Sequence, residues 1–489
     1  MSMTRFLAAA LLAALAAGCA DAARQKIALP PLGAAPAPQT IFGQATLTGD
    51  GDPAAPPAPP QVPDRPLTLD ECLAIAQKVS PGLDSADQAH LGALWSRWQS
   101  ITAFLPTAGA EYSAARNYDG RLGSRLRAGL PLPTSAILAG QNSAYTNKYS
   151  WQVGVSQPLF AGGQNAANYL LARLGVAAAD IKRVQAREDL NLAVKQVYFG
   201  ILAQEKALDV AKPSVVNLKS HLNVAQNFYD VGMAPKNQVL EADVTLAKAV
   251  QEANALEREL MVSRARLNIF LRRPVDAPVA VADNLKRNEF PLTLPQCLEL
   301  GLTDSPELKL GRNQVEAASK NVDVARSGFY PTVGMTYVNS SSGDTPRAHS
   351  GGAVDWNVAA VASLNVWEWG RTKAEVEKSK VDLNRAINDL TSLEDETRLE
   401  VTSNYQSLIS NSLNIEVAAK AVGSAAEDLR MVNERYMEQV ATNTEVLDAQ
   451  TRYSQAQYDY YNALYEYNLA WANLERSLGR PVKPSQGQG

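Results

Sequence analysis

The sequence holds few side chains of the types and spacing that catalysis requires. Its 489 residues include only three histidines, His90, His221 and His349. None of them belongs to a His-Glu-x-x-His zinc motif, and no Gly-x-Ser-x-Gly nucleophile elbow is present. The pair Gly162-Gly163 is typical of a turn between a strand and a helix rather than of a phosphate-binding loop. We therefore expect no catalytic residue, no metal site and no cofactor.

Cys19 is the residue with the clearest chemical role, because its surroundings resemble a bacterial lipobox. Arg5 gives the N-terminus a positive charge, and residues 6–15 form an apolar stretch of signal-peptide length. The stretch ends in Leu15-Ala16-Ala17-Gly18-Cys19. Ala16 departs from the leucine that is usual there. The pattern predicts a signal peptide over residues 1–18 and a lipoprotein whose Cys19 carries lipid, including palmitate. The alternative is an ordinary cleavage site with an incidental cysteine.

The other two cysteines, Cys72 and Cys297, occupy equivalent positions of an internal repeat. Each lies in the first turn of an expected helix, with a leucine next to it. Buried small side chains are the simpler interpretation, and a disulfide between the two is the alternative.

Charge and hydropathy restrict the partners. The net charge is −4 and is spread without long blocks of one sign, which argues against nucleic acid. No apolar run reaches the ~20 residues that a membrane-spanning helix needs, so a membrane crossing would have to use strands. Ala20, rather than aspartate, follows Cys19, which fits sorting to the outer membrane. Residues 19–66 are rich in proline and alanine and predict a lipid-anchored linker.

Two long helices are expected, because apolar residues recur every seven positions in two matching series. The first series is Val194, Ile201, Leu208, Val215, Leu222 and Tyr229. The second is Val401, Leu408, Ile415, Val422, Leu429 and Tyr436, at one constant offset from the first. Such a repeat keeps one seam of a helix against a partner helix. A helix of about 65 residues at ~1.5 Å per residue would be a rod of roughly 100 Å.

Each rod follows a predicted β-hairpin. Residues enriched in Val, Tyr, Trp, Thr and Gly with rough alternation predict four strands, at 107–118, 149–160, 332–339 and 355–367. The strands have the length of bilayer-spanning strands, and aromatic residues near their ends suit a membrane interface. Four strands cannot close on themselves in a membrane. Either they pack on a soluble body, or several chains share one sheet.

The repeat sets the domain boundaries that we predict. Repeat 1 covers residues 67–271, with hairpin strands about 107–160 and a long helix over 164–229. An equatorial connector follows over 272–291. Repeat 2 covers 292–478, with hairpin strands about 332–367 and a long helix over 371–436, and a tail occupies 479–489.

The order helix, hairpin, long helix, turn and return helix, given twice behind a lipobox, resembles the TolC-like outer membrane factor family in its efflux lipoprotein branch. The motifs that carry the resemblance span about residues 67–482; they are Leu67-Thr68-Leu69-Asp70-Glu71, Pro158-Leu159-Phe160-Ala161-Gly162-Gly163, Tyr229-Asp230-Val231-Gly232-Met233 and Glu445-Val446-Leu447-Asp448-Ala449. The resemblance implies a mostly α fold with a transmembrane β portion. It also implies a homotrimer that shares a twelve-stranded barrel in the outer membrane above a long α-helical periplasmic tunnel.

The resemblance further implies a function and partners. The protein would be the exit duct of a tripartite efflux system, docked to a periplasmic adaptor and an inner-membrane, proton-driven pump, and it would export small toxic molecules. The alternative within the family is the outer-membrane channel of a type I protein secretion system. An exported coiled-coil scaffold or adhesin is the alternative from another class; it explains the rods but not the two hairpins.

By position, the resemblance assigns roles to the turns that follow the rods. The adaptor-contact candidates are Val231, Gly232, Met233 and Ala234 in the first turn, and Val440, Ala441 and Thr442 in the second. The second turn has Glu438-Gln439 where the family often has Val-Gly. Ala441 stands where some members carry a basic residue that locks the aperture, so that lock would be absent or replaced.

Two acidic residues follow the second turn. The resemblance places Glu445 and Asp448 at the periplasmic aperture. Three copies of each around an axis would form a negatively charged constriction that is selective for cations. The alternative is that both are solvated helix residues.

Overall fold

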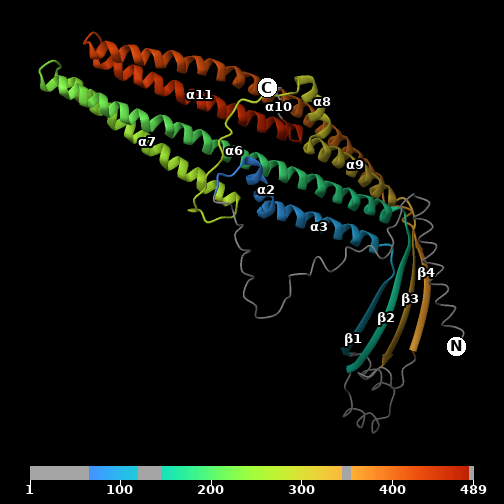
Figure 1. The fold of residues 1–489 in the computed structure, drawn as a ribbon. Helices are drawn as coiled ribbons and strands as arrows, with labels where there is room; N and C mark the ends of the chain where they lie inside the picture. Colours follow the sequence, from blue (N-terminus) through green and yellow to red (C-terminus); the bar gives the residue numbers. More distant parts are fainter. Residues whose placement is uncertain (1–64, 119–144, 344–353, 484–489) are drawn as a thin grey trace, which may run out of the picture. The chain divides into compact units, whose positions relative to one another are not determined.

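The fold is described by a computed structural model over residues 65–118, 145–343 and 354–483 (Figure 1). Cys19, the signal peptide, nearly all of the predicted linker, His349 and the end of the tail lie outside the described residues. The first half of the element order is α2 Leu69–Val79, α3 Pro81–Thr102, β1 Thr107–Tyr118, β2 Tyr145–Ala161, α6 Gln164–Asp230 and α7 Lys236–Phe270. The second half is α8 Leu294–Asp304, α9 Pro306–Ser327, β3 Thr332–Gly343, β4 Val354–Ser363, α10 Arg371–Met437 and α11 Asn443–Leu478.

The two halves therefore have the same elements in the same order, and the predicted fold class is confirmed. Local sequence explains why the elements begin where they do. Thr68 and Thr293 each form a capping box with the residue three positions later, which starts α2 and α8. A proline follows each of these helices, at Pro81 and Pro306, and begins the next helix after a one-residue break.

The chain divides into two compact units, and both units combine the two sequence repeats. In the described residues, one unit holds the strands with residues 92–176 and 315–386. The other holds 65–91, 177–314 and 387–483. The unit boundaries fall inside α3, α6, α9 and α10. The two predicted repeats therefore describe the order of the sequence, whereas each compact unit contains residues from both repeats.

The strand-containing unit has one four-stranded antiparallel sheet in the order β1-β2-β3-β4. The two hairpins meet between β2 and β3, where the register shifts between Pro158 and Phe160. The prediction that the fourth strand continues to Trp367 is wrong, because β4 ends at Ser363 and Trp367 lies in an irregular segment. Residues 364–369 contain Val and Trp, which are common in strands, but no described strand pairs with this segment.

Gly162 ends β2 in a conformation that requires glycine. Its φ is +61°, and a Cβ atom there would lie 2.5 Å from the carbonyl oxygen of Ser327. Gly163 also has a positive φ but has open space around its Cα. The hairpin thus turns into α6 through a close backbone contact with the end of α9.

The helical unit contains the main core, and the seven-residue seam lies in it. Val194, Ile201, Val401 and Leu408 are fully buried or nearly so. They pack in one apolar cluster with residues of α2, α7, α8 and α11. The seam does not extend to the end of α6 as predicted, because Tyr229 is 39% exposed. Its neighbour Phe228 packs instead against a second buried cluster, which consists of Val432, Tyr436, Ala441, Val446 and Ala449.

Ion pairs and hydrogen bonds show the order of the long helices within this unit. Arg452 of α11 pairs with Asp428 of α10 at 2.7 Å, and Lys195 of α6 pairs with Glu475 of α11. Arg264 of α7 reaches Glu205 of α6 at 2.8 Å. These pairs link α11 to both α10 and α6, and α7 to α6, in the bundle of long helices drawn in Figure 1.

The two repeat-equivalent cysteines are core residues. Cys72 and Cys297 are both buried and free, which supports the simpler interpretation and excludes the disulfide. Burial raises the pKa of the Cys72 thiol to about 11, so it stays a neutral, weakly reactive group at physiological pH.

Among the described residues, no helix is apolar over a stretch long enough to cross a membrane.

Candidate functional site at the helical tips

The two turns that follow α6 and α10 have the same backbone geometry. In the first, Met233 N donates to Phe228 O at 2.7 Å and Gly232 has a φ of +77°. In the second, Val440 N donates to Arg435 O at 2.8 Å and Gln439 has a φ of +62°. The departure at Glu438-Gln439 therefore does not alter the turn. Gln439 adopts the left-handed conformation that Gly232 adopts at lower cost.

The tips expose apolar side chains outside any core. Val231, Met233 and Val440 are 68%, 58% and 66% exposed. Gly232 and Thr442 are also exposed, and Ala234 is half-buried. Ala441 differs from the other predicted contact residues, because it is buried in the tip cluster with Val432, Tyr436, Val446 and Ala449. Its methyl group is too small to reach past these larger neighbours, so it supports the turn from inside.

One buried amide joins the two tips. Asn443, the first residue of α11, is 1% exposed. Its Oδ1 lies 2.7 Å from Nε2 of His221 on α6. Its Nδ2 donates to a carboxylate oxygen of Glu241 on α7 at 3.1 Å and to the carbonyl oxygen of Gln238 at 3.3 Å. The side chain thus connects three helices from both sequence repeats.

His221 is held in this network in a desolvated position. Its ring stacks at a tilt on Tyr436, with 5.0 Å between ring centroids. Burial lowers the pKa of His221 from its ordinary value, and the contact with Asn443 opposes that shift. The neutral imidazole is therefore favoured near neutral pH.

Sequence analysis set His221 aside as incidental and did not consider Asn443. The sequence carries no clear signal for Asn443, which stands in the polar run Thr442-Asn443-Thr444-Glu445 that is common at the start of a helix. The partners of Asn443 are more than 200 positions away in the chain, so only the fold could reveal them.

The predicted aperture residues have different surroundings. The carboxylate of Glu445 accepts hydrogen bonds from Thr442 N at 3.2 Å and Thr442 Oγ1 at 3.0 Å, which completes a capping box at the start of α11. These bonds lower the pKa of Glu445, and Arg435 at 3.8 Å adds to the effect. Asp448 is exposed. Glu445 thus has a structural role in the single chain, whereas Asp448 is free to face solvent.

A groove of about 320 Å³ lies beside the network, between α6, α10 and α11. His221, Asn217, Asn433 and Gln450 contribute to its lining. The hydroxyl of Tyr436 also belongs to it and is buried without a hydrogen-bond partner among the described residues.

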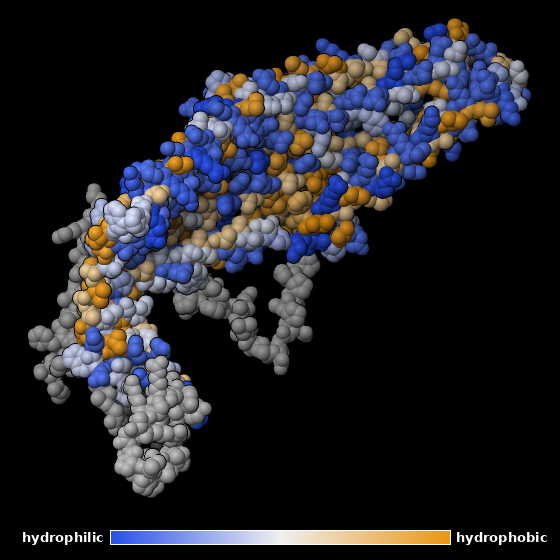
Figure 2. Space-filling view, turned by 180° about the vertical axis from the view of Figure 1, so that it is seen from behind, coloured by the Kyte–Doolittle hydropathy of each residue, from blue (hydrophilic) through white to orange (hydrophobic). Residues whose placement is uncertain are grey.

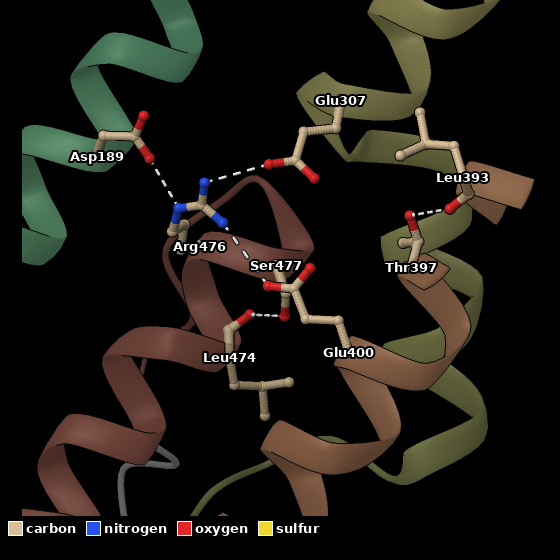
Figure 3. Close-up of polar contacts among 8 residues, drawn as sticks. All are labelled: Asp189, Glu307, Leu393, Thr397, Glu400, Leu474, Arg476 and Ser477. Carbon is tan, nitrogen blue, oxygen red and sulfur yellow. Dashed lines mark hydrogen bonds and ion pairs between the residues drawn. The ribbon is translucent and has the colours of Figure 1, made fainter. Parts of the chain in front are cut away.

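A second polar centre braces the rods far along the chain from the tips. Arg476 of α11 contacts Asp189 of α6 at 2.7 Å, Glu307 of α9 at 3.2 Å and Glu400 of α10 at 3.6 Å (Figure 3). Burial raises the pKa of Glu400, and the nearby Glu307 adds to the rise. One guanidinium therefore holds three carboxylates from three helices. No group of His, Cys, Asp and Glu in the described part of the chain is arranged to hold a metal ion.

The sequence matches a family model described as outer membrane efflux protein, over residues 81–271 and 298–480, which include both long helices and both turns. The chain belongs to the outer membrane efflux protein family. Its place is the outer membrane, where it serves as the exit duct of an efflux system, and it is not an enzyme.

Curated relatives of this outer membrane efflux protein are distant. The fusaric acid resistance protein FusA of Burkholderia cepacia is 25% identical over 225 residues, which are 45% of this chain and only 42% of FusA. The outer membrane efflux protein BepC of Brucella suis is 23% identical over 72% of this chain and 77% of BepC. The alkaline protease secretion protein AprF of Pseudomonas aeruginosa is 24% identical over 68% of this chain and 70% of AprF.

A solved structure shares the fold of this efflux protein. The outer membrane protein VceC of Vibrio cholerae matches with a TM-score of 0.71 at 17% identity, over 85% of this chain and 97% of VceC. A match over 85% of the chain includes parts of both halves.

Proposed function

We propose that three copies of this chain form one continuous duct, which carries small toxic molecules out of the cell from an inner-membrane, proton-driven pump or from the periplasm. A periplasmic adaptor joins the duct to the pump at the helical tips. The observation that carries the proposal is the pair of unpaired strand edges. In the described sheet β1 and β4 each pair with one neighbour only.

Open strand edges are a liability unless something pairs with them. β1 of one copy and β4 of the next have unfilled hydrogen-bonding edges of similar length, 12 and 10 residues. Pairing between neighbours around a three-fold axis satisfies all of them at once. The homotrimer that we propose uses the two edges that the described sheet leaves open.

The outer side of α10 supports association of the rods. Leu399, Leu413, Val417 and Met431 are exposed. Leu399 and Leu413 lie two heptads apart on α10, as do Val417 and Met431, and Val417 follows Leu413 by four positions. A stripe of that spacing fits the side of another long helix. In the trimer it lies against the rods of the next copy.

The tips are the docking surface for the adaptor. Val231, Met233 and Val440 present apolar side chains on turns fixed by backbone hydrogen bonds. Exposed Gly232 and Thr442 and half-buried Ala234 complete the rim, and buried Ala441 supports it from inside. Exposed apolar groups on a rigid turn are typical of a protein interaction site.

The three-fold axis also gives the acidic residues a role. Asp448 from three copies, with Glu445 behind it at the helix start, forms a negatively charged ring at the aperture. Such a ring favours cations over anions. Arg435 neutralises part of the charge of Glu445, so Asp448 carries the larger share of the selectivity.

Two features attach the protein to the outer membrane. Cys19 carries the lipid, and the aromatic segment after β4 lies at the bilayer surface. Trp367 and Trp369 are 74% and 89% exposed with ring centroids 5.7 Å apart, and the surface of the strands carries apolar patches (Figure 2). Paired exposed tryptophans suit the boundary between lipid and water.

Deletion of the gene and complementation test the export function. We expect deletion to raise sensitivity to small toxic compounds and the wild-type chain to restore resistance, with protein secretion unchanged. If sensitivity stayed the same while export of one protein was lost, the type I secretion alternative would replace efflux. A native mass without a trimer in detergent would favour the scaffold alternative.

A further inference from the structure

A pocket of about 620 Å³ opens in the helical unit, away from the tips. Three chain segments line it: the start of the described chain at Arg65 to Leu67, the α7 residues Met261 and Arg264, and the loop from Arg273 to Ala280. Three arginines and one acidic residue, Asp276, are among the lining side chains. The lining is thus positively charged in a chain whose net charge is −4.

Hydrogen bonds fix the walls of this pocket in place. Asn268 is 1% exposed, and its Nδ2 donates to the carbonyl oxygens of Ala277 at 2.8 Å and Val275 at 3.3 Å. Leu67 N donates to Ala280 O at 2.9 Å. The hydroxyl of Tyr198 donates to the carbonyl oxygen of Leu67 at 3.1 Å from below. The pocket is therefore preformed, which lowers the entropic cost of binding.

The three arginines differ in whether a carboxylate pairs with their charge. Arg65 pairs with Glu71, and Arg264 pairs with Glu205 at 2.8 Å. The Nε of Arg264 is nevertheless buried without a hydrogen-bond partner in the described residues. Arg273 donates only to the carbonyl oxygen of Pro278, at 3.2 Å, and forms no ion pair within the described part of the chain. Arg273 is therefore the guanidinium of the three that no carboxylate neutralises in the described residues.

Apolar groups lie next to these donors. Met261 is 61% exposed and Val275 is 58% exposed, and both line the pocket. Covering such side chains with an apolar part of a ligand lowers the free energy. A guanidinium group binds phosphate and carboxylate oxygens through two parallel hydrogen bonds. Together they fit a ligand with one anionic group and a short hydrocarbon part.

We propose that this pocket binds a small organic anion, with its phosphate or carboxylate group on Arg273 and Arg264 and its hydrocarbon part on Met261 and Val275. None of the tip residues lines the site. The anion is either a soluble metabolite or the headgroup of an acidic lipid, since both present the same chemistry. Binding does not depend on the proposed transport role.

Calorimetric titration of the full-length protein in neutral detergent at low salt tests the site. The probes are inorganic phosphate, n-butyl phosphate, n-butanol and dihexanoyl phosphatidylglycerol. We expect n-butyl phosphate to bind more tightly than inorganic phosphate and n-butanol to give no saturable heat. Arg273→Gln should weaken n-butyl phosphate about tenfold or more, as loss of a charge-assisted hydrogen bond does. Met261→Gln should remove the advantage over inorganic phosphate.

Arg272→Gln is the matched control. It removes the same charge one position away, and Arg272 does not line the pocket. It should bind like the wild type. Arg273-dependent binding that is tighter for dihexanoyl phosphatidylglycerol assigns the site to lipid, and tighter binding of n-butyl phosphate assigns it to soluble anions. Equal affinity of the wild type and Arg273→Gln for both probes would overturn the proposal.

Discussion

At the scale of single residues, the buried amide of Asn443 is the feature that links the two halves of the chain at the tips. It satisfies His221, Glu241 and the Gln238 carbonyl with one side chain. A buried polar group that loses its partner costs about 1–3 kcal/mol. The structure of the tips therefore depends on one buried residue that is not on the exposed surface.

Asn443→Ala should loosen the tips without unfolding the rods. The change leaves His221 and Glu241 without their shared partner, so we expect a loss of about 1–3 kcal/mol in the free energy of unfolding. Single-channel recordings in planar bilayers should show a higher open probability. Asn237→Ala removes an exposed amide nearby and serves as the control. Equal recordings from the two variants would show that Asn443 does not link the tips.

Acid should weaken the same contact. Because the pKa of His221 is lowered in the folded state, the unfolded chain takes up a proton first as pH falls below the ordinary value of about 6.5. Stability therefore falls on acidification through that range and is fully present above it. An NMR titration of the imidazole should give a pKa below 6.5 for the peak that His221→Gln removes. A value at or above 6.5 would contradict the burial argument.

At the scale of elements, the braced ends of the rods and the turns out of the sheet determine the architecture. Arg476 holds carboxylates from α6, α9 and α10, and Gly162 sets the backbone path from β2 into α6. Both contacts join segments that are far apart in the chain. Each can be tested by a pair of substitutions that differ in one physical respect.

Gly162→Ala and Gly163→Ala separate a steric clash from backbone strain. Both residues have a positive φ, so each alanine costs roughly 1 kcal/mol of strain. Only at Gly162 would the new Cβ meet the Ser327 carbonyl, at 2.5 Å. We expect a clearly larger drop in melting temperature for Gly162→Ala. Similar drops for the two variants would mean that the backbone shifts to relieve the clash.

Arg476→Gln should destabilise the helical unit at neutral pH by about 1–3 kcal/mol, because three carboxylates lose their shared cation. The deficit should shrink as pH falls towards the raised pKa of Glu400, since protonated carboxyls no longer repel one another. Arg480→Gln is the control. Arg480 forms an ion pair with Asp304 at 3.6 Å, and its side chain is more exposed than that of Arg476. Chemical denaturation at two pH values measures both. A deficit that grows in acid would disprove the charge argument.

The sequence predicts most of the regular elements but not the polar contacts at the tips. Spacing of Val194, Ile201, Val401 and Leu408 predicts the buried seam, because seven-residue periodicity is a local property. The extension of the fourth strand to Trp367 is wrong, because strand formation needs a pairing partner that local composition does not reveal. The contacts of Asn443 and Arg476 were out of reach for the same reason.

At the scale of the whole molecule, the open strand edges and the α10 stripe call for neighbouring copies. The proposal of a homotrimer requires that these surfaces be covered. Each of the two compact units contains residues from both repeats. Neither repeat therefore forms a compact unit by itself. The trimer and its partners stay predictions that interface substitutions can test.

Val417→Asp places a charge in the middle of the exposed α10 stripe. We expect it to shift the protein from trimer to monomer in detergent, because burial of an unpaired carboxylate at a helix interface costs several kcal/mol. Native mass spectrometry gives the stoichiometry directly. Glu416→Asp, an acidic substitution one position away that keeps the charge, should remain trimeric. A trimeric Val417→Asp variant would place the interface elsewhere.

The interleaving of the two repeats has a consequence for biogenesis. The core contacts of the helical unit connect residues as distant as Asp189 and Arg476, 287 positions apart. The strand-containing unit needs the chain up to Ala386, and the helical unit is complete only when the end of α11 has emerged from the inner membrane. Long-range closure of this kind slows folding and prolongs exposure of apolar surface. The exported chain therefore needs protection by periplasmic chaperones for longer than a protein whose domains fold one after another.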